Sequence, residues 1–259
     1  MTIRSNIDAD GIAELVVDNP PVNALDVAGW FELAATITEL GENAEVHVVL
    51  LAADGRGFNA GVDIKEMQAT EGFDALLGAN RGCYAAFKAV YECAVPVICA
   101  VNGYCLGGGI GLVGNADVIV AADDATFGLP EVDRGALGAA THLARLVPQH
   151  KMRAMVYTAE TATAQELAAY GSVLAVVPAD ELRSAAREVA GKIATKDPTV
   201  IRAAKACLNG IDPVDVNRSY RFEQGYTFEL NLSGVADEHR DDFVDRSGTG
   251  AATPGGDAQ

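Results

Sequence analysis

Short apolar segments alternate with helical patterns through the first half of the chain, and this alternation restricts the possible folds more than any other feature. Residues 28–40 and 85–94 carry apolar side chains at helical spacing. Because a crossover helix returns the chain to the starting end of a sheet, such alternation favours parallel strands. The sequence therefore predicts an α/β protein with a layered core and mostly parallel strands. The strand segments are residues 12–17, 47–52, 96–103 and 117–128, the last including a turn.

Helical patterns dominate from about residue 148, interrupted by one short apolar segment at 173–177. We therefore expect a core over residues 1–195 that holds the ligand site, followed by an α-helical C-terminal region over 196–246 that serves oligomerisation. The last stretch, 247–259, is rich in glycine, alanine, threonine and proline, a composition typical of a disordered tail.

The charge of the chain argues against one large class of partners. With 36 acidic and 19 basic residues the formal net charge is −17, and nucleic-acid binding depends on neutralising phosphates. No uninterrupted apolar run of about 18 residues is present, so we expect no membrane contact. The N-terminal segment resembles no signal peptide, and the five cysteines include no CxxC pair, which favours a cytoplasmic protein with reduced thiols. No cluster has metal-ligand spacing, so we expect no metal.

Two glycine-containing turns, residues 56–67 and 102–112, each follow a buried strand and lead into a helix. At such a position backbone N–H groups lack intrahelical partners and carry partial positive charge. They can therefore donate hydrogen bonds to an oxyanion. A tight turn or close helix packing would explain either glycine cluster alone equally well.

Together with the segment Asn19–Leu25 (NPPVNAL), the two turns resemble the enoyl-CoA hydratase/isomerase (crotonase) superfamily over roughly residues 19–243. The resemblance implies a crotonase-like layered β/α spiral core and an oxyanion hole formed by the N–H groups of Val62 and Gly108. It implies an acyl-CoA substrate, with coenzyme A as part of the substrate and no permanently bound cofactor. It also implies a homo-oligomer, a trimer or a hexamer. The CoA contacts it implies are Asn23, Ala24, Leu25, Arg56, Ala60, Asp63, Ile64 and Lys65.

Arg56 and Lys65 flank the first turn and are the local cations that so acidic a chain would need for CoA phosphates. Solvated surface charge is the alternative interpretation of both residues.

Hydratases of this family use two glutamates, and this chain matches only one of the two positions. The first position is Gly111, which has no side chain, and the second is Glu131. A single carboxylate leaves one positioned acid/base, which disfavours hydration by the two-glutamate route. A glutamate introduced at Gly111 is expected to face the substrate near Glu131.

Other polar residues have weaker patterns. His142 follows a glycine- and alanine-rich turn and is a catalytic candidate, although a structural hydrogen bond would also explain it. The run 237–242 (DEHRDD) is typical of a solvated helix face. The resemblance to the family implies that its C-terminal helix can close the acyl pocket or touch a neighbour's CoA, so one member of this run could take part. Tyr84, Tyr91 and Cys93 lie on a helix expected to line that pocket.

Four longer segments resemble one branch of the superfamily, the ring-opening hydrolases of actinobacterial steroid catabolism. This implies C–C bond hydrolysis of a cyclic diketone CoA thioester, with the thioester enolate held in the oxyanion hole. An enoyl-CoA hydratase or a Δ3/Δ2-enoyl-CoA isomerase is the alternative, and a catalytically reduced acyl-CoA-binding subunit is a second alternative. The four segments are residues 55–68, 79–98, 127–150 and 220–244.

Overall fold

The computed structural model describes residues 2–248, and a six-stranded sheet with strand order β1-β2-β3-β4-β6-β9 forms its centre. The first strand pairs antiparallel with its neighbour, and every later pairing in this sheet is parallel. The α/β class with mostly parallel strands is therefore confirmed. The strands are β1 (Thr2–Ile7), β2 (Ile12–Asp18), β3 (Val48–Ala53), β4 (Val97–Val101), β6 (Val118–Ala122) and β9 (Ala175–Val177).

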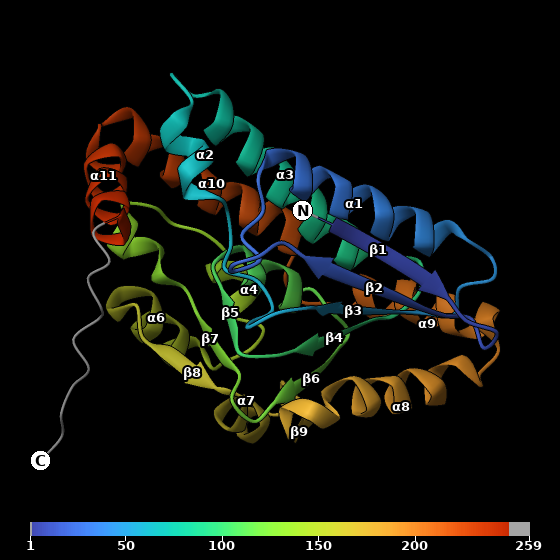
Figure 1. Cartoon of the computed structure of the whole chain (residues 1–259). Coiled ribbons are helices and arrows are strands. Elements are labelled where there is room, and N and C mark those ends of the chain that lie inside the picture. The colour runs from blue at the N-terminus through green and yellow to red at the C-terminus, as the bar shows by residue number, and fades with distance from the viewer. Residues whose placement is uncertain (1, 249–259) are drawn as a thin grey trace, which may run out of the picture.

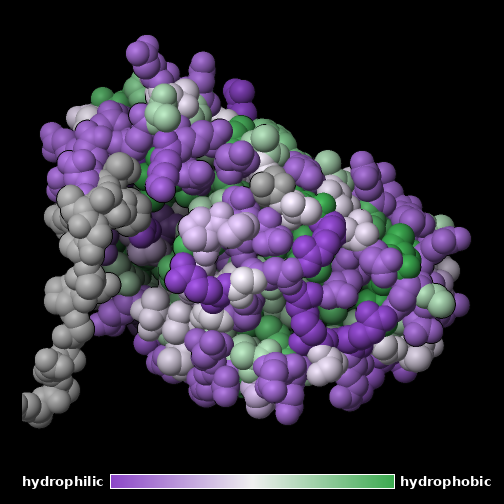
Figure 2. Space-filling model, in the orientation of Figure 1, coloured by the Kyte–Doolittle hydropathy of each residue, from purple (hydrophilic) through white to green (hydrophobic). Residues whose placement is uncertain are grey.

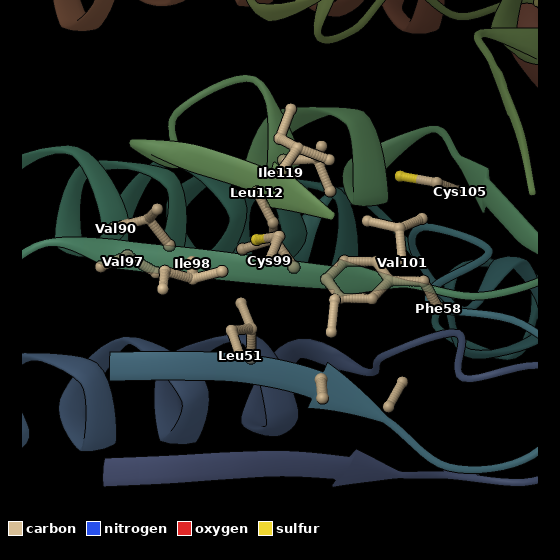
Figure 3. Packing of buried hydrophobic residues seen from close by; sticks show 14 of the residues in the cluster. Leu51, Phe58, Val90, Val97, Ile98, Cys99, Val101, Cys105, Leu112 and Ile119 are labelled. Carbon is tan, nitrogen blue, oxygen red and sulfur yellow. The ribbon is translucent and has the colours of Figure 1, made fainter. Parts of the chain in front are cut away.

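Helices cover both faces of this sheet, which explains why its central strands read as continuous apolar runs. Figure 1 shows α1 (Val27–Glu42) and α3 (Asp74–Glu92) above the sheet and α8 (Leu182–Ala194) below it. Every residue of β3 and β4 is buried. Leu51, Cys99 and Ile119 are in register across three neighbouring strands, and Figure 3 shows Cys99 beside Leu112 of α4 (Gly108–Val113).

A smaller sheet with strand order β5-β7-β8 stands beside the main one and carries the loops of the site. The strands β5 and β8 have three residues each, too few for a recognisable periodicity, and the sequence did not predict them. Its strands are β5 (Tyr104–Leu106), β7 (Thr126–Gly128) and β8 (Thr161–Thr163), and the helices near it are η1 (Pro130–Arg134), α5 (Ala140–Leu143), α6 (Gln149–Thr158) and α7 (Ala164–Tyr170).

The edge strand β1 was also missed by the sequence pattern. Its residues are exposed except for the half-buried Ile3, so the segment lacks the apolar alternation of a buried strand. It forms because its backbone pairs with β2, an interaction that side-chain patterns do not reveal.

The last helices fold back over the body of the protein. Figure 1 shows α10 and α11 together with α2 at one end of the molecule, and α10 contacts α3 and α5. Residues 247–248 are the end of α11, so the expected tail begins later than predicted, and its remainder, 249–259, lies outside the described residues. No helix within residues 2–248 is long and apolar enough to span a bilayer. The remaining elements are α2 (Ile64–Ala69), η2 (Ala179–Glu181), α9 (Pro198–Gly210), α10 (Val216–Leu232) and α11 (Val235–Gly248).

Candidate active site

The two glycine-containing turns, 45 residues apart in the chain, meet at one place in the structure. Leu25 N–H donates to Gly61 O at 2.9 Å, and Asp63 N–H donates to Leu25 O at 2.9 Å, which joins the N-terminal turn to the first segment. A Cβ built on Gly61 would lie 3.1 Å from the nitrogen of Gly108. The backbone nitrogens of the two segments are therefore neighbours, as an oxyanion hole requires.

Asn59 holds this junction together, a role that the sequence did not single out. Its side-chain oxygen accepts from Gly61 N–H at 2.8 Å, and its amide nitrogen donates to Asn23 O at 2.6 Å. Its carbonyl accepts from Leu106 N–H at 2.8 Å. The side chain is buried, so each of these bonds lies away from competing water.

Val62 and Gly108, the two expected oxyanion donors, both line one cavity of the protein. Within residues 2–248 neither backbone N–H donates to a protein acceptor. Gly108 is the first residue of α4, where an N–H has no acceptor inside the helix. Two unused donors in the lining of one cavity can bind a carbonyl oxygen that gains negative charge.

Glu131 faces the same cavity from η1. A Cβ on Gly107 would lie 2.7 Å from Glu131 Oε1, so the carboxyl packs directly against the second turn. Its Oε2 is buried without a hydrogen-bond partner in the described part of the chain. Burial raises the pKa of Glu131 to about 8, although the charge of Arg134 acts in the opposite direction. A carboxyl that titrates near neutral pH can serve as a general acid or base.

The cavity is mostly apolar and takes residues from both the core and the C-terminal helices. Such walls suit a hydrophobic acyl group, whose orientation is then fixed by a few polar side chains. The lining residues come from the first turn, α3, the second turn, η1, the loop 136–139, α10 and α11.

The expectation for Gly111 is wrong. A Cβ on Gly111 would lie 2.2 Å from the ring of Phe87, so the direction from this position is filled by an aromatic side chain of α3. Phe87 is buried and itself lines the cavity. A glutamate at this position would therefore meet the ring of Phe87 before it could reach the substrate.

His142 does not line the cavity. Its ring lies behind the wall, with its centroid 5.0 Å from that of Phe87 and 4.9 Å from that of Tyr220. Burial lowers the pKa of His142 to about 3, so the ring is neutral at physiological pH. The structure therefore places this catalytic candidate in an aromatic cluster and gives it no path to the substrate.

The residues expected to contact CoA divide into two groups. Ala60 and Ile64 line the cavity with Val62. Asn23, Ala24, Leu25 and Asp63 instead shape the turns: Asn23 is buried and donates to Asp54 O and Gly57 O at 2.7 and 2.8 Å. Half-buried Ala24 accepts from an asparagine amide at 2.6 Å, and the Asp63 carboxylate caps α2.

Arg56 and Lys65 are both exposed at the two ends of the first segment. Neither forms an ion pair with any residue that the structure describes, whereas most other cations of this acidic chain are paired or hydrogen-bonded. They are thus available to an anionic ligand.

Several residues of the cavity were missed because they come from helices far away in the sequence. The helix α3 lines the cavity as expected, through residues that include Asn80 and Cys83, whereas Tyr84, Tyr91 and Cys93 are not among its lining residues. From the C-terminal helices the missed residues include Tyr220, Thr227 and Asn231. Spacing along α3 and α10 could have shown which faces are apolar, but not that these faces meet.

Arg240 is the member of the 237–242 run that reaches the cavity. Its guanidinium donates to Gln68 Oε1 at 3.2 Å and to Asn231 Oδ1 at 2.7 Å, and it also pairs with Asp237. These contacts tie α11 to α2 and α10 across the end of the cavity.

The model of one family, described as enoyl-CoA hydratase/isomerase, matches residues 8–225. The chain belongs to this family. A Rhodococcus jostii protein named (7aS)-7a-methyl-1,5-dioxo-2,3,5,6,7,7a-hexahydro-1H-indene-carboxyl-CoA hydrolase is 69% identical over 95% of this chain and 95% of its own length. A Mycobacterium tuberculosis protein of the same name is 65% identical over 95% of this chain and its whole length.

The fold also agrees with that of solved members of the family. The crystal structure of an enoyl-CoA hydratase/isomerase from Xanthobacter autotrophicus superposes with a TM-score of 0.85 at 25% identity, covering 96% of this chain and 93% of that one. The crotonase-like core is therefore confirmed.

Proposed function

We propose that this enoyl-CoA hydratase/isomerase family member is a hydrolase that opens a ring by cleaving a C–C bond of a cyclic diketone CoA thioester. The observation that carries the proposal is its 69% identity, over nearly the full length of both chains, to a relative named as a hydrolase of a dioxo-hexahydroindene-carboxyl-CoA. That name describes a bicyclic diketone CoA thioester. The substrate would derive from steroid, and more narrowly cholesterol, catabolism, as the resemblance of the sequence implies.

Glu131 would act first, as the general base. Its carboxylate takes a proton from a water molecule, and the resulting hydroxide attacks a ring ketone carbon. The tetrahedral intermediate then collapses to a carboxylic acid, which releases its proton to water, and breaks the bond between that carbon and its ring neighbour. The electron pair of the broken bond passes to the neighbouring carbon.

The oxyanion hole would stabilise this electron pair. If the leaving carbon is conjugated with the thioester, the charge moves to the thioester oxygen, where the N–H groups of Val62 and Gly108 can donate to it. Protonated Glu131 then returns its proton to carbon. One water is consumed, one C–C bond is broken, and the catalytic carboxylate is regenerated.

The packing of Gly111 favours this route over hydration. Hydration by two glutamates needs a second carboxyl, and Phe87 fills the space next to position 111. The intact Glu131 site also disfavours a catalytically reduced binding subunit. The direct test is turnover of a synthetic bicyclic dione CoA thioester followed by mass spectrometry, where ring opening adds one water. Hydration of crotonyl-CoA at ordinary enzyme rates without ring opening would contradict the proposal.

The CoA group would lie along the first turn. In this proposal Arg56 and Lys65 meet the phosphates, while the thioester oxygen lies between Val62 and Gly108. Ala60 and Ile64 would contact the pantetheine chain, and the segment 23–25 would shape the entrance. Coenzyme A is present only as part of the substrate.

A homo-oligomer, a trimer or a hexamer, would cover the C-terminal helices. Phe222 and Leu232 on α10 are 70% and 73% exposed, and Ile211 before it is 71% exposed. Figure 2 shows a face of the molecule on which hydrophilic residues outnumber hydrophobic ones. Exposed apolar side chains as large as these three favour a covering partner surface. Sedimentation should give a multiple of the 26.9 kDa chain mass. A monomer would contradict this part of the proposal.

We also propose a reducing, cytoplasmic environment. All five cysteines are unbridged, and four of them are buried. The division into a core over 1–195 and an oligomerisation region over 196–246 remains a proposal, and α10 and α11 contribute to the cavity in addition.

A further inference from the structure

The loop that follows Glu131 forms a wall of the cavity beside the Glu131 carboxyl. Residues 136–139 line the cavity, and Ala136 N–H donates to Glu131 O at 3.0 Å. A Cβ on Gly138 would lie 3.9 Å from Glu131 Oε1. The position of this loop therefore sets the space between the Glu131 carboxyl and a bound ring.

The backbone of this loop is strained at its last residue. Ala139 has a φ of +59°, a left-handed conformation that costs a residue with a Cβ free energy. Such a conformation persists only when the surroundings hold it. The contacts that hold it come from α10.

Glu223 makes the first of these contacts. Its Oε1 accepts from Ala140 N–H at 2.7 Å and its Oε2 accepts from Thr141 N–H at 3.1 Å. Ala140 and Thr141 begin α5, so the carboxylate satisfies two backbone N–H groups that have no helical acceptor. Both carboxylate oxygens are thus engaged, and Glu223 is not among the residues that line the cavity. It cannot transfer a proton to the substrate directly.

Ser219 and Thr227 make the other two contacts from the same face of α10, one helical turn on each side of Glu223. Thr227 Oγ1 donates to Leu137 O at 2.6 Å. Ser219 Oγ lies 2.9 Å from Thr141 Oγ1. Three side chains of α10, at positions i, i+4 and i+8, therefore hold the loop at Leu137 and at the start of α5.

We propose that Glu223, assisted by Thr227, is a positioning residue of the reaction: it fixes the loop 136–139 and thereby the place of the ring ketone relative to Glu131. This inference rests on the proposed function. It assigns α10 a part in turnover that is separate from any contact between subunits.

The charge of Glu223 has a second measurable effect, on the pKa of Glu131. It raises the pKa of Glu131, whereas the charge of Arg134 on η1 lowers it. Cys83 of α3 and Tyr220 of α10 also face this carboxyl, and burial raises the pKa of both, so they remain neutral at physiological pH. Loss of the Glu223 charge should therefore lower the pKa of Glu131.

The experiment compares Glu223→Gln with Glu229→Gln, an exposed glutamate of the same helix. With the bicyclic dione CoA thioester, Glu223→Gln should lower the plateau of kcat by about 10-fold or more, because a small misplacement of a substrate costs up to about 10²-fold. The acidic limb of its pH profile should also move to lower pH. Glu229→Gln should leave both unchanged. A folded Glu223→Gln protein with the wild-type plateau and limb would overturn the proposal.

Two further measurements keep the test decisive. The Glu131 carboxyl can be titrated without substrate, by the infrared difference between each protein and its Glu131→Gln counterpart. The pKa of Glu131 should fall in Glu223→Gln even if the bicyclic thioester is not the substrate. Failure of the positioning role can therefore be distinguished from failure of the proposed function. If Glu223→Gln does not fold, Thr227→Val takes its place. This variant should lower the plateau of kcat and leave the acidic limb of the pH profile unchanged. An unchanged plateau in Thr227→Val would overturn the positioning role.

Discussion

The turn-built wall of the cavity, formed by residues 60–62 and 107–108, is held by backbone hydrogen bonds and by the buried amide of Asn59. The helical wall, formed by the loop 136–139 with α10 and α11, is held by side chains such as Glu223, Thr227 and Arg240. The first wall presents donors for an oxyanion. The second presents apolar surface and a few polar groups that suit a particular ring.

This difference separates what the fold supplies to a whole family from what selects one substrate. Backbone donors depend little on side-chain identity, so the turn-built wall can serve any acyl-CoA. Side-chain contacts change with single substitutions, so the helical wall can be adapted to a particular acyl group. Glu131 lies between them, packed on Gly107 and continuing into the loop.

Removal of the proposed base between the two walls should have the largest effect. Glu131→Gln keeps the size of the side chain and removes its basicity, so kcat should fall by about 10²–10⁴-fold while acyl-CoA binding survives. In the wild type, kcat/KM should rise with pH up to about 8, because the base must be deprotonated and burial raises its pKa to that value. Steady-state kinetics across pH, with binding measured by calorimetry, would check both. A Glu131→Gln protein that turns over normally would assign the base to another residue.

The same substitution should stabilise the protein at high pH. The unfolded chain ionises this carboxyl near pH 4.5, whereas the folded protein retains the proton until about pH 8. The unfolded state therefore holds fewer protons between these values, and stability from this group falls as pH rises. Glu131→Gln should gain stability relative to the wild type over that window, by about 1–4 kcal/mol at its top. Urea unfolding at pH 4.5 and pH 8.5 tests this, and an equal difference at both pH values would contradict it.

An added carbon at Gly111, behind the turn-built wall, should lower the stability of the protein. Gly111→Ala places a methyl group 2.2 Å from Phe87 and should destabilise by about 1–3 kcal/mol, as overpacked cores do. Gly191→Ala in α8 is the matched control, since nothing lies within 4 Å of its added carbon, and it should be neutral or stabilising. Adding Phe87→Leu should recover part of the loss. Equal melting temperatures for the two alanine variants would show that the ring moves freely aside.

The smallest effect is expected at the outer end of the turn-built wall. Arg56→Ala and Lys65→Ala should each raise KM a few-fold and leave kcat nearly unchanged, because exposed ionic contacts are worth about 0.2–1 kcal/mol. Affinity should also weaken with added salt. Initial rates at several salt concentrations would show this. Insensitivity to both substitutions and to salt would mean that backbone and apolar contacts hold the CoA group alone.

The two walls also differ in how much of them the sequence predicted. Val62, Gly108 and Glu131 lie in short motifs, and the resemblance of these motifs to those of the family was enough to name the three residues. Thr227 and Arg240 reach the cavity only because α10 and α11 fold back, and no spacing within their own helices shows this. The prediction for His142 was misleading because the sequence around a histidine does not show whether its ring packs against buried aromatic residues or faces a substrate. The expectation for a glutamate at position 111 was wrong because the ring that occupies this space belongs to Phe87, 24 residues earlier in the chain.

The contact between Gly111 and Phe87 has a consequence for how this enzyme could change during evolution. To acquire a second catalytic carboxyl, a lineage would need a smaller residue at 87 and a glutamate at 111. The first change alone leaves a hole in the core, and the second alone forces a charge against an aromatic ring. Each intermediate would carry a fitness cost before any new activity appeared. The two sites are therefore expected to vary together or not at all, which makes the present chemistry difficult to reverse by single mutations.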